Sequence, residues 1–375
     1  MPPRIATGFR KVSAVVSTDV IPSSPDQVTP TWLSTVLGDA DVRVSGVAMT
    51  PVGTGQTGAA YRASVEYAAN PNSLPTSFVV KLPSQDQEIR SRVGLGCKTE
   101  AGFYRELASR VQVPIPKAYH CDSANDGLDF VLVMQDLTPA VQGDEVVGCS
   151  VHAATLAAEA IAGLHAPFWC DEAIADFPHV VIPRATPELA DGVGIAVRMA
   201  ADVTLRDFGS HLSDEDCRTI DEAANITPAW LMSAPERFSV LHGDYRLNNV
   251  LFGPDESWIS VVDWQSTMIG LPTRDLAYFV VSGLKPEQRS GSERELVNVY
   301  ARSLQRHGVT GYDEDTCWQD YRLGVLQLNL IATLGFASTA TPTHRSETMM
   351  ETLFSRSCRA IRELEVFELI HQLNA

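Results

Sequence analysis

The sequence predicts an α+β protein in which a small β-rich part precedes a larger, mostly helical part. Up to about residue 137, short strand-like runs follow one another, with one leading helix and one later helix. From residue 138 to residue 375, most apolar residues recur at helical spacing. At roughly 100–200 residues per domain, a chain of 375 residues suggests two domains or lobes. We therefore expect two lobes, residues 1–137 and 138–375, joined near Gln135–Pro139.

The strands of the β-rich part up to residue 83 are expected to form a meander of antiparallel strands. A short helix is predicted from Thr29, a plausible N-cap, to Gly38. Residues 59–67 (AAYRASVEY) alternate between two faces, which is typical of a half-buried strand, and SFVVKLP at 77–83 is a second strand. Residues 97–111 (CKTEAGFYRELASRV) repeat apolar side chains every four residues, which predicts a helix. A strand, a glycine-containing turn and a strongly apolar strand then complete this part.

The second part is expected to be helical except around residues 240–263. An alanine-rich helix is predicted at 153–169, and loops and helices are predicted at 170–237. Short apolar runs flank a polar turn in VLHGDYRLNNVLF, residues 240–252. Three long helices are predicted around 287–307, 313–340 and 346–373.

Composition excludes several classes of partner. Apolar residues make up 45% of the chain, charged residues 20%, and the net charge is -17, which argues against nucleic acid and anionic membrane surfaces. Seven cysteines without a C-x-x-C pair fit a reducing compartment. No run approaches ~20 apolar residues, and the N-terminus lacks the apolar core of a signal peptide. We expect a cytoplasmic protein with a small-molecule partner; the oligomeric state is not indicated.

A glycine-rich segment, GTGQTG, carries Gly53, Gly55 and Gly58. It precedes an alternating strand rather than a helix, which disfavours a dinucleotide-binding fold, and no Lys-Ser/Thr follows, which disfavours a Walker A loop. A glycine hairpin between strands can fold its backbone amides over phosphates. An ordinary glycine turn is the alternative.

Lys81 ends the apolar strand FVVKLP, so its neighbours belong to the core. A buried ammonium needs a partner or a ligand, because an unpaired buried charge is costly. Glu100 and Glu106 on the following predicted helix are both candidates. A surface lysine is the alternative.

The stretch VLHGDYRLNNVLF places Asp244 and Asn249 at D-x-x-x-x-N spacing, and Asp263 follows a second apolar run in ISVVDWQS. Two strands that each end in a carboxylate would bring those carboxylates together at one edge. One carboxylate and the Asn amide oxygen could hold Mg²⁺, and the other carboxylate could accept a proton from an attacking hydroxyl. Ligation of a hydrolytic metal by His242, Asp244 and Asp263 is a competing interpretation.

Taken in chain order, the glycine segment, strand Lys, helix Glu, H-x-D-x-x-x-x-N and strand-end Asp resemble the protein-kinase-like fold. More narrowly, VLHGDYRLNNVLF, VVDWQSTMIGLPTRDLAYF, TEAGFYREL and IAGLHAPFW resemble the aminoglycoside phosphotransferase and choline kinase family. The resemblance extends from about Val42 to near the end of the chain. It implies a two-lobed fold with a small antiparallel sheet lobe and a larger helical lobe.

The resemblance also implies residue roles. Asp244 would be the catalytic base, and Asn249 and Asp263 would bind Mg²⁺. Lys81 would grip the nucleotide phosphates, with Glu100 the better match for its partner. The linker would pair with adenine through its backbone; it comprises Met134, Gln135, Asp136 and Leu137.

Further residues near the motif are expected to support it. Arg246 could neutralise charge on the transferred phosphoryl group or could pair with a surface carboxylate. Asp275 is expected to brace the loop and His242 to be a hydrogen-bonded scaffold residue, while the role of Asn248 is open. Trp264-Gln265 replaces the Phe-Gly of protein kinases, so an activation switch of their type is not expected.

The sequence thus predicts an ATP- and Mg²⁺-dependent kinase that phosphorylates a hydroxyl of a small metabolite or antibiotic. A catalytically inactive nucleotide-binding regulator is the alternative. The acceptor is open: acids such as Asp202, Asp207 and 214–216, with Phe168 and Trp169, could line a pocket for a cation, or the acids could form a solvated surface run.

Overall fold

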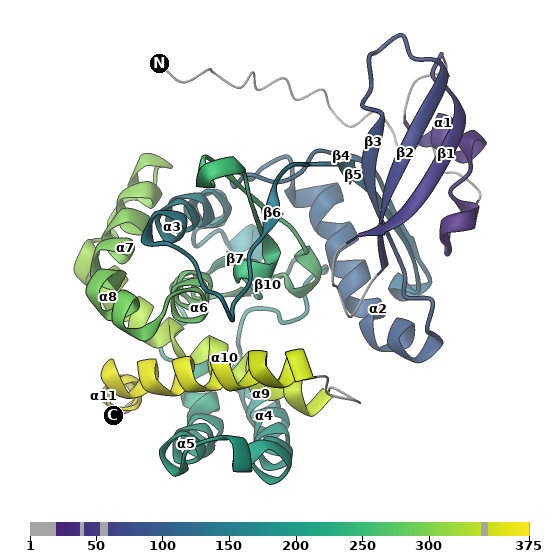
Figure 1. The fold of residues 1–375 in the computed structure, drawn as a ribbon. Helices are drawn as coiled ribbons and strands as arrows, with labels where there is room; N and C mark the ends of the chain where they lie inside the picture. The colour runs from purple at the N-terminus through teal and green to yellow at the C-terminus, as the bar shows by residue number, and fades with distance from the viewer. Residues whose placement is uncertain (1–19, 38–40, 53–58, 339–343, 375) are drawn as a thin grey trace. The chain divides into compact units, whose positions relative to one another are not determined.

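The computed structural model describes residues 20–37, 41–52, 59–338 and 344–374 (Figure 1). Contacts divide the chain into two compact units. Unit 1 comprises Met1–Arg110 with Pro116–Thr138, and unit 2 comprises Val111–Ile115 with Pro139–Ala375. The short segment 111–115 is tied into unit 2 by backbone hydrogen bonds, from Gln112 to Gly163 and from Val261 to Pro114.

Unit 1 is built on a five-stranded antiparallel sheet in the order β1-β2-β3-β5-β4. Figure 1 shows these strands with one helix beside them and a second helix packed against the sheet. The strands and helices of unit 1 are α1 (Pro30–Val36), β1 (Arg43–Val52), β2 (Ala59–Ala69), β3 (Ser77–Leu82), α2 (Gln87–Gly102), β4 (Ala118–Ala124) and β5 (Asp129–Gln135).

The core of unit 1 lies between α1 and the sheet. Thr29 caps α1 by accepting a hydrogen bond from the Trp32 N–H, and Trp32, Leu33 and Val36 point into the core. On β3, burial alternates so that Phe78, Val80 and Leu82 share the buried face. Val79 and Lys81 therefore share the opposite face. The predicted leading helix is confirmed, and so is the antiparallel meander of the first three strands, but β3 then pairs with β5 rather than with β4.

Unit 2 is mostly helical. Its helices α4, α5, α9 and α10 pack on one another, and α3 packs on α7 (Figure 1). The helices of unit 2 are α3 (Val151–His165), α4 (Pro187–Phe208), α5 (Asp214–Leu231), α6 (Thr273–Gly283), α7 (Pro286–Arg306), α8 (Glu314–Gly324), α9 (Leu326–Ser338), α10 (His344–Glu363) and α11 (Val366–Leu373). Within the described residues, none of the helices is long and apolar enough to cross a membrane.

Two small antiparallel sheets of unit 2 carry the polar motif. One pairs β7 (Ser239–Leu241) with β10 (Met268–Gly270), and the other has the order β6-β8-β9. The strands of the second sheet are β6 (Val141–Gln142), β8 (Val250–Phe252) and β9 (Ile259–Val261).

The structure corrects the predicted elements at three places. The helix predicted from Cys97 begins ten residues earlier, at Gln87, because Asp86 accepts the N–H groups of Glu88 and Ile89 as an N-cap. The helix predicted at 313–340 is two helices, interrupted at Val325. The helix predicted at 346–373 is also divided, because Glu365 adopts a left-handed conformation with φ of 49°. Apolar periodicity continues across both breaks, which is why the pattern alone joins the helices.

Candidate active site

In unit 1, Lys81 and Glu100 form a buried ion pair. The Lys81 Nζ donates to both carboxylate oxygens of Glu100, at 2.8 and 2.7 Å. Glu100 is fully buried on α2, and the Lys81 side chain on β3 is 13% exposed. Glu106 lies in a π-helical turn, Phe103–Leu107, and is exposed. The structure therefore pairs Lys81 with Glu100, the better of the two candidates.

The predicted linker residues are held at the end of β5. The N–H of Gln135 is already engaged by the Lys117 carbonyl at 2.8 Å. The Asp136 carboxylate accepts hydrogen bonds from Arg62 on β2, from Ser77 and from Thr138. Burial opposes ionisation, but these donors outweigh it and hold the pKa of Asp136 well below its ordinary value. The linker is thus anchored to the sheet by the side chain of Asp136.

The glycines Gly53, Gly55 and Gly58 lie outside the described residues. Their predicted phosphate-binding role stays a prediction.

In unit 2, Asp244 follows β7 on a loop that we call the Asp244 loop, residues 242–249. Its carboxylate is about one quarter exposed. Asn249 Nδ2 donates to Asp244 Oδ2 at 2.9 Å and to the Asp244 carbonyl at 2.8 Å. The Arg246 Nε lies 3.0 Å from Asp244 Oδ1. The carboxylate is therefore held in one orientation but stays open to solvent on one side.

The Asp244 loop is fixed from below by a second, fully buried carboxylate. Asp275, at the start of α6, accepts the N–H of His242 at 2.6 Å and the N–H of Gly243 at 2.9 Å. Its Oδ2 also lies 3.2 Å from His165 Nε2. Gly243 has φ of +81°, and a Cβ there would lie 2.1 Å from the Ser266 carbonyl, so only glycine fits. The expected bracing role of Asp275 is confirmed.

His242 is a scaffold residue, as predicted. Its Nε2 lies 3.0 Å from the Val262 carbonyl, and its Nδ1 lies 3.3 Å from the Asp244 N–H. A carbonyl requires a proton on Nε2 and an N–H requires an acceptor at Nδ1, so both bonds are satisfied by the neutral ring. Because the ring is buried and both nitrogens are engaged, His242 is poorly suited to ligate a metal. This counts against the metallohydrolase interpretation.

Arg246 pairs with two carboxylates. Besides Asp244, its Nη1 lies 3.3 Å from Glu145 Oε1, and Glu145 is 1% exposed. Burial opposes the charge, but Asp244 and Glu145 outweigh it and raise the pKa of Arg246 above its ordinary value. The same Glu145 oxygen accepts the Asn248 N–H at 3.0 Å. Arg246 therefore does pair with a carboxylate besides Asp244, but that carboxylate, Glu145, is buried and not on the surface as expected.

Asn249 and Asp263 come together at one end of the β8–β9 hairpin. Val250 pairs with Val261, and the Val262 N–H donates to the Asn249 carbonyl at 2.9 Å. Asn249 therefore lies opposite Val262, the residue that immediately precedes Asp263 in the chain. Asp263 adopts a left-handed conformation with φ of 69° and ψ of 73°, a strained geometry that occurs at functional sites.

The predicted strand pairing is wrong in one respect. The strands before Asp244 and Asp263 are not neighbours, since β7 pairs with β10 and β9 pairs with β8. The His242–Val262 hydrogen bond, rather than a shared sheet edge, links the two segments.

The donor chemistry of this corner suits Mg²⁺. Because Asn249 Nδ2 is committed to Asp244, its Oδ1 is the amide atom left to face a cation. An amide oxygen and a carboxylate are hard ligands, and Mg²⁺ takes few protein ligands together with substrate oxygens. No group of three or more His, Cys, Asp or Glu able to hold a metal occurs in the described residues. The amide oxygen of Asn249 and the carboxylate of Asp263 are thus two donors that would fit a Mg²⁺ also bound by substrate oxygens.

The acids considered for a cationic acceptor are engaged elsewhere. Asp202 pairs with Arg198, and Asp207 pairs with Arg206, both on the exposed surface of α4. Residues 214–216 form the first turn of α5, where acids favour the helix dipole, and Arg362 pairs with Asp216. Phe168 is buried, and Trp169 packs on Tyr312. The structure therefore favours the surface interpretation of these acids.

Two buried residues of the site were not predicted. Glu145 lies in an irregular segment without periodicity, so no sequence signal points to it. Tyr278 is buried on α6, where burial and then the negative charge of Asp244, with which it also shares a hydrogen bond, raise its pKa well above its ordinary value. It lies three residues after Asp275 in RDLAYF, and that helical spacing is a usable signal.

Comparison with known proteins identifies the family. A model of the phosphotransferase enzyme family matches residues 66–315. Acyl-CoA dehydrogenase family member 11 of Pongo abelii is 36% identical over 92 residues, 20% of this chain and 12% of the relative. Its human counterpart is 35% identical over 91 residues, with the same coverage. The chain thus spans about an eighth of the length of these curated relatives.

Solved structures share the fold at low identity. Choline kinase from Cryptosporidium parvum Iowa II has a TM-score of 0.55 at 13% identity, covering 87% of this chain and 92% of its own. A putative aminoglycoside phosphotransferase from Ralstonia eutropha JMP134 has a TM-score of 0.53 at 16% identity, covering 88% and 97%. The predicted protein-kinase-like α+β fold is confirmed. Because the family model covers well over half of its residues, the chain belongs to the phosphotransferase enzyme family.

Proposed function

We propose that the chain transfers the γ-phosphoryl group of ATP to a hydroxyl of a small molecule, with Mg²⁺. The observation that carries the proposal is the Asp244 carboxylate, which is oriented by Asn249 and Arg246 yet partly exposed. A general base must be positioned within hydrogen-bond reach of the proton it takes. Asp244 would orient the acceptor hydroxyl and take its proton as the hydroxyl oxygen attacks phosphorus.

Each unit supplies a separate part of the proposed machinery. In unit 1, Lys81 would hold the donor phosphates, with Glu100 fixing its ammonium. Gly53, Gly55 and Gly58 would cover the phosphates with backbone amides. The linker 134–137 would bind the adenine, and Asp136 and Leu137 are its better candidates because the Gln135 N–H is engaged within the sheet.

The remaining roles belong to unit 2. Asn249 and Asp263 would hold the cation, and Mg²⁺ bound there would neutralise charge on the phosphate oxygens. Arg246 would turn its guanidinium toward the transferred phosphoryl group while Glu145 keeps it near Asp244. Most of the acceleration would come from positioning and electrostatics.

The proposal requires a hydroxyl on the acceptor and does not require a positive charge. The related structures include a choline kinase and a putative aminoglycoside phosphotransferase, whose names point to cationic acceptors. Here the acids that could attract such a cation form surface ion pairs or lie in the first turn of α5. An ATP-consumption screen over aminoglycosides, amino sugars, choline analogues, macrolides and hydroxylated lipids should therefore include neutral acceptors at equal weight.

The test of the proposal is Asp244→Asn, which keeps the size of the side chain and removes its basicity. We expect transfer to an accepted substrate to fall roughly 10²–10⁴-fold, while ATP still raises the Tm. Asp255→Asn, an exposed aspartate on a nearby turn, is the matched control and should leave turnover unchanged. Near wild-type turnover of Asp244→Asn would overturn the assignment. ATP binding that is indifferent to Mg²⁺, without transfer to any acceptor, would favour the inactive regulator.

A further inference from the structure

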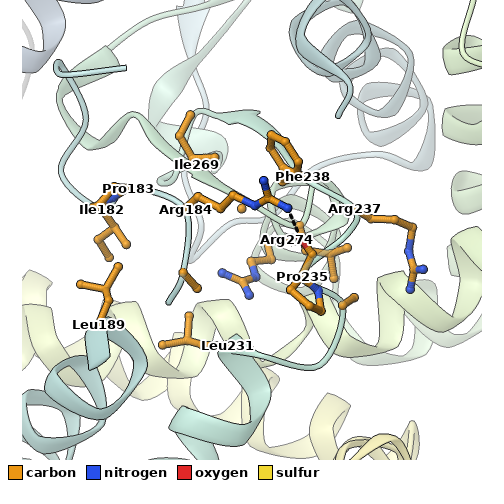
Figure 2. A pocket seen from close by; sticks show the side chains of 14 residues that line it. Ile182, Pro183, Arg184, Leu189, Leu231, Pro235, Arg237, Phe238, Ile269 and Arg274 are labelled. Atoms are coloured by element: carbon orange, nitrogen blue, oxygen red, sulfur yellow. Dashed lines mark hydrogen bonds between the residues drawn. The ribbon is translucent and has the colours of Figure 1, made fainter. Parts of the chain in front are cut away.

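Unit 2 contains a second concavity, at the far end of the β7–β10 pair from Asp244. Its 14 lining residues come from the segment 182–189, the end of α5, and the chain around β7 and β10 (Figure 2). An inner cavity of about 20 Å³ lies within a concavity of about 430 Å³ that opens to solvent. Phe238 precedes β7 and Asp244 follows it, so at about 3.3 Å per residue the strand alone separates them by roughly 10 Å.

Three arginines line this concavity, and the guanidinium groups of two of them have carboxylate acceptors. Arg184 donates to both carboxylate oxygens of Glu172 and to the Pro235 carbonyl. Arg237 forms a two-pronged pair with Asp320, at 2.7 and 2.8 Å.

Arg274 is different. It is 94% buried, at 6% exposure, and no hydrogen bond or ion pair from the described residues reaches its guanidinium; its Nε is fully buried without an acceptor. In Figure 2 the guanidinium points into the space between Leu231 and Arg184. Its flat face lies 4.0 Å from the Trp230 ring, which supports the charge but accepts none of its in-plane N–H groups.

The carboxylate of Asp275, the next residue in the chain, does not supply the missing acceptor for the Arg274 guanidinium. Both oxygens of Asp275 are engaged by the Asp244 loop. Burial lowers the pKa of Arg274 to about 10, and the charge of Asp275 only partly opposes that shift. A buried guanidinium without an acceptor costs free energy that a bound anion would recover.

We propose that this concavity binds a small organic carboxylate, whose head group meets the edge of Arg274 and whose apolar chain lies against the wall. The inner cavity has room for about one small polar group. The outer wall is largely apolar, formed by Ile182, Pro183, Leu189, Leu231 and Ile269. A planar guanidinium matches the two oxygens of a carboxylate. The site goes beyond the proposed phosphotransferase role and does not depend on it.

The test measures the Tm of the full chain with sodium butyrate, with butyramide, and with sodium chloride and sodium phosphate at equal ionic strength. We expect butyrate alone to raise the Tm, saturably and by a few degrees. Arg274→Gln should lose this response. Arg206→Gln makes the same change on an arginine that pairs with Asp207 on the exposed surface of α4, outside the concavity, and it should keep the response.

A second variant keeps the test decisive if Arg274→Gln does not fold. Ala185→Leu adds bulk at a half-buried lining position and leaves Arg274 in place. It should keep the ligand-free Tm and lose the butyrate response. No response of the wild-type chain to butyrate, an equal response to butyramide, chloride or phosphate, or a full response in Arg274→Gln would each overturn the proposal.

Discussion

The two units hold their predicted site residues by different means. In unit 1, Lys81 and Glu100 stand on a strand and a helix, and their side chains meet directly. In unit 2, Asp244 stands on a loop, and the loop backbone is fixed by the buried carboxylate of Asp275. Regular elements position a side chain through their own hydrogen bonds, whereas a loop needs side chains to supply the missing acceptors.

This difference determines whether a second substitution can restore the stability that a first substitution removes. A charge pair between two side chains can be replaced by two apolar side chains of similar volume, because both charges leave together. A carboxylate that accepts backbone N–H groups cannot be replaced in this way, because the N–H groups remain. We therefore expect unit 1 to tolerate a paired substitution and unit 2 to be sensitive at its brace.

The largest effect is expected for Asp275→Ala. The variant leaves the N–H groups of His242 and Gly243 buried without their acceptor, and also removes the partner of His165 Nε2. We expect a loss of about 3–5 kcal/mol in the free energy of unfolding of unit 2, together with loss of transfer. Urea unfolding followed by tryptophan fluorescence measures it.

Asp255→Asn is the control for this prediction, since it removes an exposed charge, keeps a side chain that tolerates the φ of 56° at this position, and should change stability by less than about 0.5 kcal/mol. If Asp275→Ala also changed the free energy of unfolding by less than about 0.5 kcal/mol, the Asp244 loop would not depend on the Asp275 carboxylate.

A smaller effect is expected for Lys81→Met, which removes the ammonium that faces Glu100. The carboxylate is fully buried while Lys81 is 13% exposed, so we expect a loss of about 3 kcal/mol in the stability of unit 1. Lys81→Met/Glu100→Leu should recover most of that loss, although ATP binding would stay weak. Urea unfolding of the wild type and both variants decides the matter, and a double variant as unstable as the single one would contradict the comparison.

The sequence predicts the two units unequally well. Lys81 and Asp244 are recognisable because each follows a short apolar run, and the D-x-x-x-x-N spacing separates Asn249 from Asn248. The choice between Glu100 and Glu106 needs the helical phase of α2, which ends at Gly102, before the π-helical turn that contains Glu106. These are local properties, so a sequence pattern can carry them.

Long-range contacts escape such patterns. Glu145 meets Arg246 across about a hundred residues of chain, from a segment without regular structure. The pairing of β9 with β8 rather than β7 depends on competition between short strands, which composition does not resolve. The unsatisfied guanidinium of Arg274 is visible only once the acceptors around it are known.

The smallest effect that distinguishes the units is the pH dependence of two arginine–aspartate pairs. In unit 1, Asp136 accepts from Arg62, Ser77 and Thr138, and these hydrogen bonds outweigh burial and lower its pKa below 3.8. In unit 2, burial of Asp320 outweighs the hydrogen bonds from Arg237 and raises its pKa above 3.8. The two carboxylates therefore act on stability with opposite sign.

Below pH 3.8 the unfolded chain takes up the Asp136 proton first, so the stabilisation by Asp136 is complete above that value and is lost as the pH falls through its lowered folded pKa. For Asp320 the folded chain takes up the proton first, so its contribution grows as the pH falls from neutral through its raised folded pKa, and levels off near 3.8. Urea unfolding of Asp136→Asn and Asp320→Asn between pH 2.5 and 7, in steps of about half a unit, measures both slopes. Asp136→Asn should flatten the acid limb below pH 3.8, whereas Asp320→Asn should remove a rise above it. Parallel profiles for the two variants would mean that hydrogen bonding and burial do not divide the units in this way.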